Sequence, residues 1–295
     1  MHGSEHIRGI LAMLLAVALF SLMDAQLKLL AAHYPPLQVS FLRGATSLPF
    51  VLLPILARGR LARLRPVNVR LHLLRGVLSV VMLGSFVYAV RESSLATTYS
   101  IFMCAPLVVA ALSAQMLGER VTRLQWAAIG VGLGGVLLML RPQGAQWISV
   151  GSVAAVVAAL CYSLAVITLR VLARTDTTES MVFSFTFLLA IGAGLLSIPG
   201  WTPVQWAHWP LLAGVGLFGS LGQHFITEAF RNAPASVVTP FEYTALVWGV
   251  LLDLVVWGVL PGAVTLVGGA IVIGAGLYLI RHEAGLRSRD DEPLP

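Results

Sequence analysis

The sequence predicts an all-α integral membrane protein with ten transmembrane helices, arranged as two inverted repeats of five with both termini in the cytoplasm. Three observations predict this fold. First, 58% of the 295 residues are hydrophobic and only 11% are charged, whereas a soluble domain carries about 25% charged residues. Second, long uncharged runs recur along the chain, and third, the two halves of the chain resemble each other. The composition argues against a soluble enzyme, a nucleic-acid-binding protein and a disordered chain.

The membrane spans follow from the apolar runs, because a transmembrane helix needs ~20 mostly apolar residues. Residues 93–118, 142–169 and 254–280 contain no Lys, Arg, Asp or Glu. The runs are continuous rather than alternating, which excludes membrane β-strands. Asp24 and Lys28 interrupt the end of the first run, so we interpret it as a retained helix rather than a signal peptide. The predicted spans are 8–31, 36–56, 71–90, 95–117, 124–140, 150–172, 179–199, 209–230, 235–256 and 262–280.

The basic residues predict the orientation of these helices, because short cytoplasmic loops carry an excess of Lys and Arg. With a cytoplasmic N-terminus, only Arg91 and Arg141 fall outside, and Lys28 and Arg43 fall within spans. The other 15 of the 19 basic residues fall inside: Arg8, Arg58, Arg60, Arg63, Arg65, Arg70, Arg75, Arg120, Arg123, Arg170, Arg174, Arg231, Arg281, Arg287 and Arg289.

An internal repeat relates the two halves of the chain. A shift of 142 residues places Gly9 and Ser21 on Gly151 and Ser163, and a shift of 139 places Phe102 on Phe241. The unit holds five spans, an odd number, so its second copy must enter the membrane from the opposite side. The units are 1–141 and 142–283, followed by a cytoplasmic tail, 284–295. Inverted repeats are typical of secondary transporters, whose substrate site lies near the bilayer midplane between the halves.

Ionisable residues inside a span are costly, so each should face a partner or a wet cavity. Asp24 and Lys28 stand four residues apart on one face of the first helix. Arg43 lies at a similar depth in the second helix. The three predict either a charged gate at the outer mouth or a structural ion pair between Asp24 and Lys28, with the lysine reaching toward the membrane surface.

A second polar group is predicted toward the inner side. Gln223, His224 and Glu228 lie on the eighth predicted span, and Glu242 and Tyr243 lie at a comparable depth in the ninth. A carboxylate and an imidazole can hold an amino group or relay protons. The alternative is a polar pair that fastens the two helices. No third ligand is spaced to complete a metal site, so we expect no metal.

Several motifs resemble the EamA domain of the drug/metabolite transporter superfamily. In the first half they include Tyr88-Ala89-Val90, Pro106 and Gly118-Glu119-Arg120, and the second half echoes them in Ala229-Phe230-Arg231-Asn232-Ala233 and Tyr243. The resemblance covers essentially the whole chain and implies ten helices in an inverted five-plus-five arrangement. One position departs from the family pattern, because Gly258 stands where a second Glu often closes the ninth helix.

In this resemblance, the third, fourth, sixth and ninth helices line a central cavity. The residues Tyr88, Tyr99, Met103, Tyr162 and Trp248 lie on them. Aromatic and thioether walls suit aromatic or sulfur-bearing substrates, although each of these side chains is equally compatible with plain helix packing. Pro106 removes a backbone donor inside the fourth helix, which predicts a kink.

Among the branches of the family, the chain looks most like bacterial exporters of aromatic amino acids and methionine. The resemblance therefore implies an inner-membrane secondary transporter that exports neutral amino acids by alternating access. The alternatives are another small metabolite or drug, such as a nucleotide-like compound or a sugar, and an intramembrane enzyme. No catalytic motif supports an enzyme, and no cofactor or nucleic-acid partner is expected. The substrate and the lipid bilayer are the expected partners, with the chain as a monomer or a homodimer.

Overall fold

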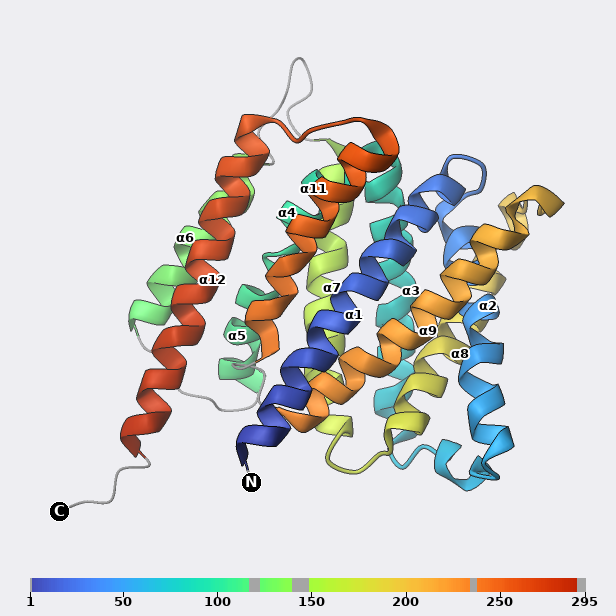
Figure 1. Cartoon of the computed structure of the whole chain (residues 1–295), viewed down its shortest axis with the longest axis horizontal. Coiled ribbons are helices and arrows are strands. Elements are labelled where there is room, and N and C mark those ends of the chain that lie inside the picture. Colours follow the sequence, from blue (N-terminus) through green and yellow to red (C-terminus); the bar gives the residue numbers. More distant parts are fainter. Residues whose placement is uncertain (1, 117–122, 140–148, 234–237, 291–295) are drawn as a thin grey trace.

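The computed structural model describes residues 2–116, 123–139, 149–233 and 238–290, and within these ranges the chain is helical and contains no strand (Figure 1). The first half contains α1 (His2–Ala31), α2 (Pro36–Ala57), η1 (Leu61–Leu64), α3 (Val69–Glu92), α4 (Leu95–Phe102), α5 (Ala105–Met116) and α6 (Arg123–Met139). The second half contains α7 (Val150–Leu172), α8 (Thr178–Ser197), η2 (Ile198–Gly200), η3 (Trp206–His208), α9 (Trp209–Asn232), η4 (Thr239–Tyr243), α11 (Thr244–Trp257) and α12 (Ala263–Asp290).

Five helices within the described ranges are long and apolar enough to cross a membrane. They are Ile7–Ala31, Pro36–Ala57, Val69–Glu92, Val150–Leu172 and Thr178–Gly200. Large apolar side chains such as Leu53, Val77 and Leu195 are exposed on the outside of the bundle. Soluble proteins rarely expose extensive apolar surface, so this outer surface suits a lipid solvent.

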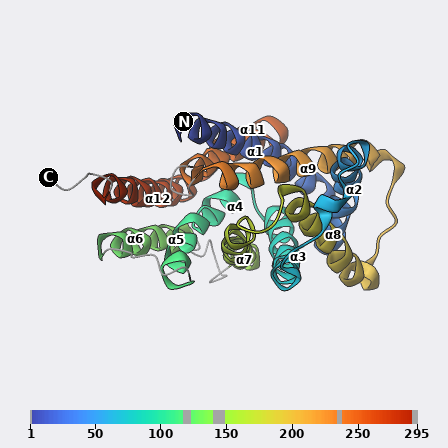
Figure 2. The same ribbon diagram turned by 90° about the horizontal axis from the view of Figure 1, so that it is seen from below.

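The helices form two layers (Figure 2). One layer holds α12, α11, α1, α9 and α2, and the other holds α6, α5, α4, α7, α3 and α8. The most extensive contacts between helices join pairs of helices from the two halves of the chain. Helix α1 packs on α9 and α3 packs on α7, while α2 packs on α8 and α6 packs on α12. If α1 is matched with α7, α2 with α8, α3 with α9 and α6 with α12, every one of these contacts maps onto another or onto itself. This is the contact pattern of two halves related by a twofold axis.

Two of the predicted spans depart from a continuous α-helix at matching positions. Helix α4 ends at Phe102 and α5 begins at Ala105, while η4 gives way to α11 after Tyr243. The break after α4 has a physical cause in Pro106, which has no N–H to donate to the carbonyl of Phe102. The predicted kink is therefore a full break. Discontinuous helices are the common way to place backbone polar groups beside a membrane binding site.

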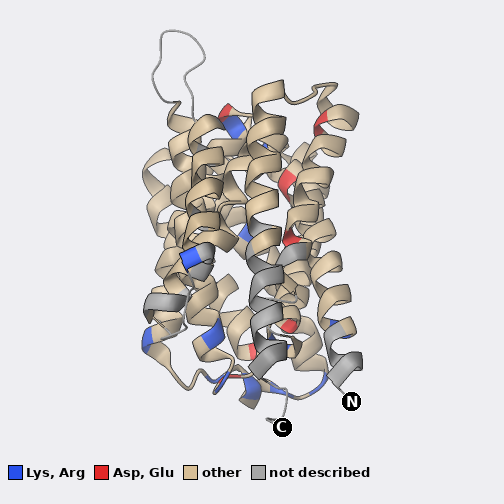
Figure 3. Cartoon of the chain, turned by 90° about the vertical axis from the view of Figure 1, so that its left-hand side faces the viewer, with Lys and Arg blue, Asp and Glu red and all other residues tan. Residues whose placement is uncertain are grey.

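Charges are unevenly distributed along the bundle (Figure 3). The start of α1 and the end of α12 lie at the same end of the molecule, and Lys and Arg gather toward that end. Asp and Glu occur at several depths. Glu119, Arg120 and Arg141, which the sequence analysis used, lie outside the described residues.

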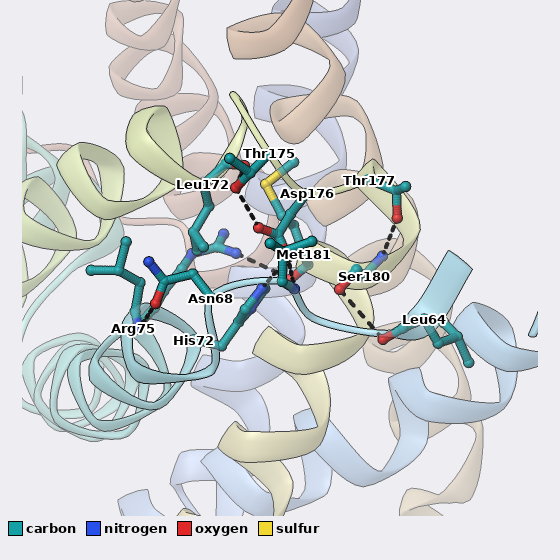
Figure 4. A network of polar contacts seen from close by, with 12 residues as sticks. Leu64, Asn68, His72, Arg75, Leu172, Thr175, Asp176, Thr177, Ser180 and Met181 are labelled. Atoms are coloured by element: carbon teal, nitrogen blue, oxygen red, sulfur yellow. Dashed lines mark hydrogen bonds and ion pairs between the residues drawn. The ribbon is translucent and has the colours of Figure 1, made fainter. Parts of the chain in front are cut away.

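A polar network joins the two halves of the chain near the end of the bundle that holds both termini (Figure 4). Asp176, in the connection between α7 and α8, lies 2.9 Å from His72 Nε2 and accepts a hydrogen bond from Val67 N–H at 2.8 Å. The Thr175 hydroxyl donates to its other oxygen at 2.8 Å. Burial pushes the pKa of Asp176 upward, but these hydrogen bonds outweigh it and hold the pKa below its ordinary value. The carboxylate therefore stabilises the junction in its charged form.

Candidate functional site

A cavity of about 150 Å³ lies between the two layers of helices. Its lining comes from α1, α2, α3, α4, α7, α8, α9, η4 and α11, so both halves of the chain contribute. Most of the wall is apolar, with the rings of Phe20, Phe86, Phe102, Phe185 and Phe230. The polar groups that line it are Ser21, Asp24, Arg43, Arg75, Tyr99, Tyr162, Gln223 and Glu242. An apolar pocket with a few convergent polar groups is the usual form of a small-molecule site.

The first polar feature of the cavity is a carboxylate–tyrosine pair between α1 and α4. The Tyr99 hydroxyl donates a hydrogen bond of 2.7 Å to Asp24 Oδ2, and both side chains are buried. The Tyr99 ring stacks on Phe86 at a centroid distance of 6.2 Å. Gly249 of α11 lies directly behind the ring, because a Cβ there would meet Tyr99 Cδ2 at 2.7 Å. The glycine thus permits the close approach that places the hydroxyl on Asp24.

A second pair lies across the cavity in the other half. The Tyr162 hydroxyl, from α7, donates to Glu242 Oε2 of η4 at 3.1 Å. Its ring contacts Phe102 at 5.2 Å. Helix α7 corresponds to α1 in the repeat, and η4 to the α4–α5 break, so both pairs join corresponding elements. The order of the two residues is reversed, however. In the first half the carboxylate lies on α1 and the tyrosine on α4, whereas in the second half the tyrosine lies on α7 and the carboxylate on η4.

Lys28 does not join Asp24. Its ammonium lies 3.3 Å from Asp253 Oδ1 of α11 and 4.5 Å from the centre of the Trp257 ring. Asp253 also accepts the backbone N–H groups of Leu95 at 3.1 Å and Ala96 at 2.7 Å. It therefore caps the N-terminus of α4, where a negative charge is favourable. Of the two alternatives for these residues, the ion pair between Asp24 and Lys28 is wrong: the partner of Lys28 is Asp253, because the side of α1 that carries the lysine faces α11.

Of the residues predicted for the site, seven line the cavity: Asp24, Arg43, Tyr99, Met103, Tyr162, Gln223 and Glu242. The remaining six lie elsewhere. His224 is exposed on the outer surface of α9, against Phe225. Glu228 accepts hydrogen bonds from Thr178 and Asn232 between α8 and α9. Residues 223 and 224 are adjacent on one helix, so their side chains point in directions about 100° apart, and only Gln223 faces inward.

The aromatic predictions divide in the same way. Tyr243 is buried in a cluster with Met103 and Val272 rather than at the cavity wall. Trp248 packs against Ala12 and Ala16 of α1 within another cluster, and Tyr88 is only partly buried. Tyr243 and Trp248 thus take part in helix packing, the alternative that the sequence left open, and Tyr88 lies outside the cavity lining.

Sequence reasoning missed Arg75 and Asp253. Arg75 was counted as an orientation signal at the inner edge of a span, yet it is 4% exposed and lines the cavity. Its position could have indicated burial, because Arg75 lies six residues after the start of α3, and an arginine that reaches toward the membrane surface should lie nearer the helix end. Asp253 lies inside the ninth predicted span, but its partners come from distant parts of the chain. Among the described residues, no three His, Cys, Asp or Glu side chains come together as metal ligands.

The fold and the cavity define a class: a helical membrane protein with a mostly apolar cavity between two related halves, as secondary transporters have. The family model described as the EamA-like transporter family matches residues 7–141 and 149–281. The chain therefore belongs to the EamA-like transporter family, within the drug/metabolite transporter superfamily. It is a multi-pass protein of the bacterial inner membrane.

Individual relatives differ in what their names say they carry. The pseudopaline exporter of Pseudomonas aeruginosa is 30% identical over 282 residues, which are 94% of this chain and 97% of the relative. The riboflavin transporter of Rhizobium johnstonii is 27% identical over 285 residues, 95% and 93% of the two chains. A solved crystal structure with 22% identity has a TM-score of 0.64 and covers 95% of this chain and 99% of its own, which shows the shared fold.

Proposed function

We propose that this transporter exports neutral amino acids, aromatic ones and methionine among them, by alternating access to the cavity. The observation that carries this proposal is the pair of buried carboxylates, Asp24 and Glu242, each held by a tyrosine at an otherwise apolar cavity. A carboxylate attracts an ammonium group strongly where water is scarce. Aromatic walls favour an apolar or aromatic side chain. A cavity of about 150 Å³ is of the size that accommodates a benzene ring in an engineered protein.

The proposed architecture is ten transmembrane helices as two inverted repeats, 1–141 and 142–283, with both termini and the tail 284–295 in the cytoplasm. Support comes from the coupled helix contacts and from the gathering of Lys and Arg at the end that holds both termini. The two-residue break after α4 and the change from η4 to α11 are candidate hinge points, one in each half. Two such halves can exchange conformations and so expose the cavity to each side in turn. No catalytic step is part of this proposal, and a monomer is sufficient for it.

The second candidate is export of a different small metabolite. The names of the relatives favour it, since one is a pseudopaline exporter and another a riboflavin transporter. A larger substrate requires the cavity to widen, which opening of the helix breaks would allow.

Purified protein in liposomes tests the proposal with labelled phenylalanine, methionine and threonine. We expect saturable flux in which each amino acid competes with the others. Glu242→Gln should lower the flux about tenfold or more, because loss of a charged contact is worth ~1.5–3 kcal/mol. The matched control is Glu92→Gln, at the exposed end of α3, which should leave the flux unchanged. Flux of riboflavin or another metabolite in the absence of amino-acid flux would favour the second candidate.

A further inference from the structure

Two arginines line the cavity, and neither forms an ion pair with an acidic side chain of the described residues. Arg43 of α2 is 5% exposed and Arg75 of α3 is 4% exposed, and both line the cavity. Their guanidinium carbons lie 5.8 Å and 4.9 Å from the centre of the same ring, Phe185 of α8. The ring is therefore a shared wall for both cations.

Each arginine uses one N–H group to contact the protein and has another N–H group without an acceptor among the described residues. Arg43 Nε donates to the sulfur of Met23 at 3.2 Å, and its buried Nη1 has no partner among the described residues. Arg75 Nη1 donates to the Met181 carbonyl at 3.1 Å, an arrangement visible in Figure 4, and its buried Nε likewise has no partner in the described part of the chain. A thioether is a weak acceptor. Both guanidinium groups thus have an N–H donor that the described residues leave without an acceptor.

Carboxylates nearby do not supply the missing charge. Asp24 is close enough to attract Arg43 but lies beyond ion-pair distance, and its carboxylate is engaged by Tyr99. Within the described ranges, the ion pairs are Lys28–Asp253, Arg63–Glu179 and His72–Asp176, none of which involves either arginine. A buried charge is costly unless it is paired, so a site with two such cations favours the arrival of an anion.

We infer that Arg43 and Arg75 form an anion subsite that receives the carboxylate of the transported solute. The guanidinium group is planar and offers donors in a fork that matches a carboxylate. The subsite rests on the proposed function and extends it, because it gives the carboxylate group of an amino acid a binding partner in the cavity. The ammonium group goes to Asp24 or Glu242, the carboxylate goes to the arginines, and the side chain contacts the aromatic wall. The cavity therefore selects solutes that carry a carboxylate over simple amines of the same size.

Equilibrium binding to the purified full-length protein tests this subsite with three probes that share one ring. L-phenylalanine carries both charged groups, phenethylamine lacks the carboxylate, and 3-phenylpropionate lacks the amine. The variants are Arg43→Gln and Arg75→Gln, with Arg75→Lys as the conservative change. Arg70→Gln is the matched control, because Arg70 is exposed at the start of α3.

We expect the two Gln variants to weaken binding of phenylalanine and 3-phenylpropionate by about tenfold or more. Binding of phenethylamine should change by no more than about twofold, and the Lys variant should recover part of the loss because it keeps the charge. This selective pattern separates the subsite from a structural role, since a destabilised cavity would lose all three probes together. Arg70→Gln should bind all three probes as the wild type does.

The subsite is wrong if the Gln variants affect the three probes equally, if they affect none, or if the wild type binds neither carboxylate probe. The proposed function has a separate test in liposomes. If the wild type binds 3-phenylpropionate through the arginines but carries no amino acid, the anion subsite stands and amino-acid export fails. If amino-acid flux persists at wild-type rates in both Gln variants, export stands and the subsite fails.

Discussion

At the scale of single residues, the cavity combines acids with neutral hydroxyl donors. The Tyr99 hydroxyl bonds one oxygen of Asp24, and the Tyr162 hydroxyl bonds one oxygen of Glu242. A phenol hydroxyl satisfies one acceptor of a buried carboxyl group but brings no positive charge of its own, so it does not form an ion pair with the acid. The sequence could indicate that both acids lie inside spans. It could not indicate which hydroxyl each acid meets, because the partners are 75 and 80 residues away.

Tyr99→Phe tests the first pair. The change keeps the ring against Phe86 but leaves Asp24 buried without its donor, so we expect the free energy of unfolding to fall by about 1–3 kcal/mol. Flux in liposomes should fall with it. Thermal unfolding and flux are measured beside Tyr88→Phe, a tyrosine of α3 outside the cavity lining. Equal effects of the two substitutions would contradict the role given to Tyr99.

Asp176 gives a pH dependence at the basic end of the bundle. Its pKa is lower in the folded protein than the ordinary 3.8, so its contribution to stability is complete above that value and is lost as the pH falls below it. The unfolding temperature of the wild type should therefore drop as the pH falls below about 4. Asp176→Asn should be less stable at pH 7 and should show a shallower drop. A parallel pH profile in the wild type and the variant would refute this reading, and Glu92→Gln controls for general charge loss.

At the scale of elements, α4 is a short helix whose position is fixed by Asp253. The eight residues of α4 carry Tyr99, while its N-terminal N–H groups bind the carboxylate from α11. So short a helix is not stable in isolation, which means that tertiary contacts decide where it begins. The uncharged run predicted one continuous span here, because a hydropathy pattern does not register a break of two apolar residues.

Removing either partner of the Lys28–Asp253 pair should have unequal effects. Asp253→Ala leaves a mostly buried ammonium and two uncapped N–H groups, so we expect a loss of about 3–5 kcal/mol. Lys28→Ala should cost less, because the carboxylate keeps both backbone donors. Unfolding of the two variants in detergent measures the difference. A larger loss for Lys28→Ala would show that the ion pair, rather than the cap on α4, dominates.

At the scale of the whole molecule, the helices of each half of the chain make their main contacts with helices of the other half. The main contacts of α1, α2, α3 and α6 are with α9, α8, α7 and α12. The cavity is the space left between these coupled layers, so movement of one half against the other changes its access. Neither half encloses the cavity alone.

Cysteine labelling in intact cells tests the proposed orientation. Single cysteines are placed at Arg60, on the exposed connection after α2, and at Trp206, which is 84% exposed at η3. The background carries Cys104→Ala and Cys161→Ala, which removes the native thiols. An impermeant reagent added outside should label position 206 and leave position 60 unlabelled until the membrane is opened. Labelling of both positions from the same side would exclude the proposed topology.

The sequence by itself determined the membrane environment, the helical fold class, the repeat and the resemblance to the EamA family. These properties can be predicted from local composition and from the repeat of residues along the chain, because a membrane span must be apolar whichever helices it contacts. It also named Asp24, Arg43, Tyr99, Tyr162 and Glu242 as candidates, since a polar side chain in a span requires a reason.

Only the tertiary structure decided which of these side chains meet. In the structure, Lys28 pairs with Asp253, His224 faces outward and Arg75 lines the cavity with Arg43. The fourth predicted span is broken between α4 and α5, and the ninth changes from η4 to α11 at the matching position. The physical reason is that a partner is chosen by helix rotation and by packing between distant segments. An offset of one residue turns a side chain by about 100° around a helix, and no local pattern in an apolar sequence specifies that angle.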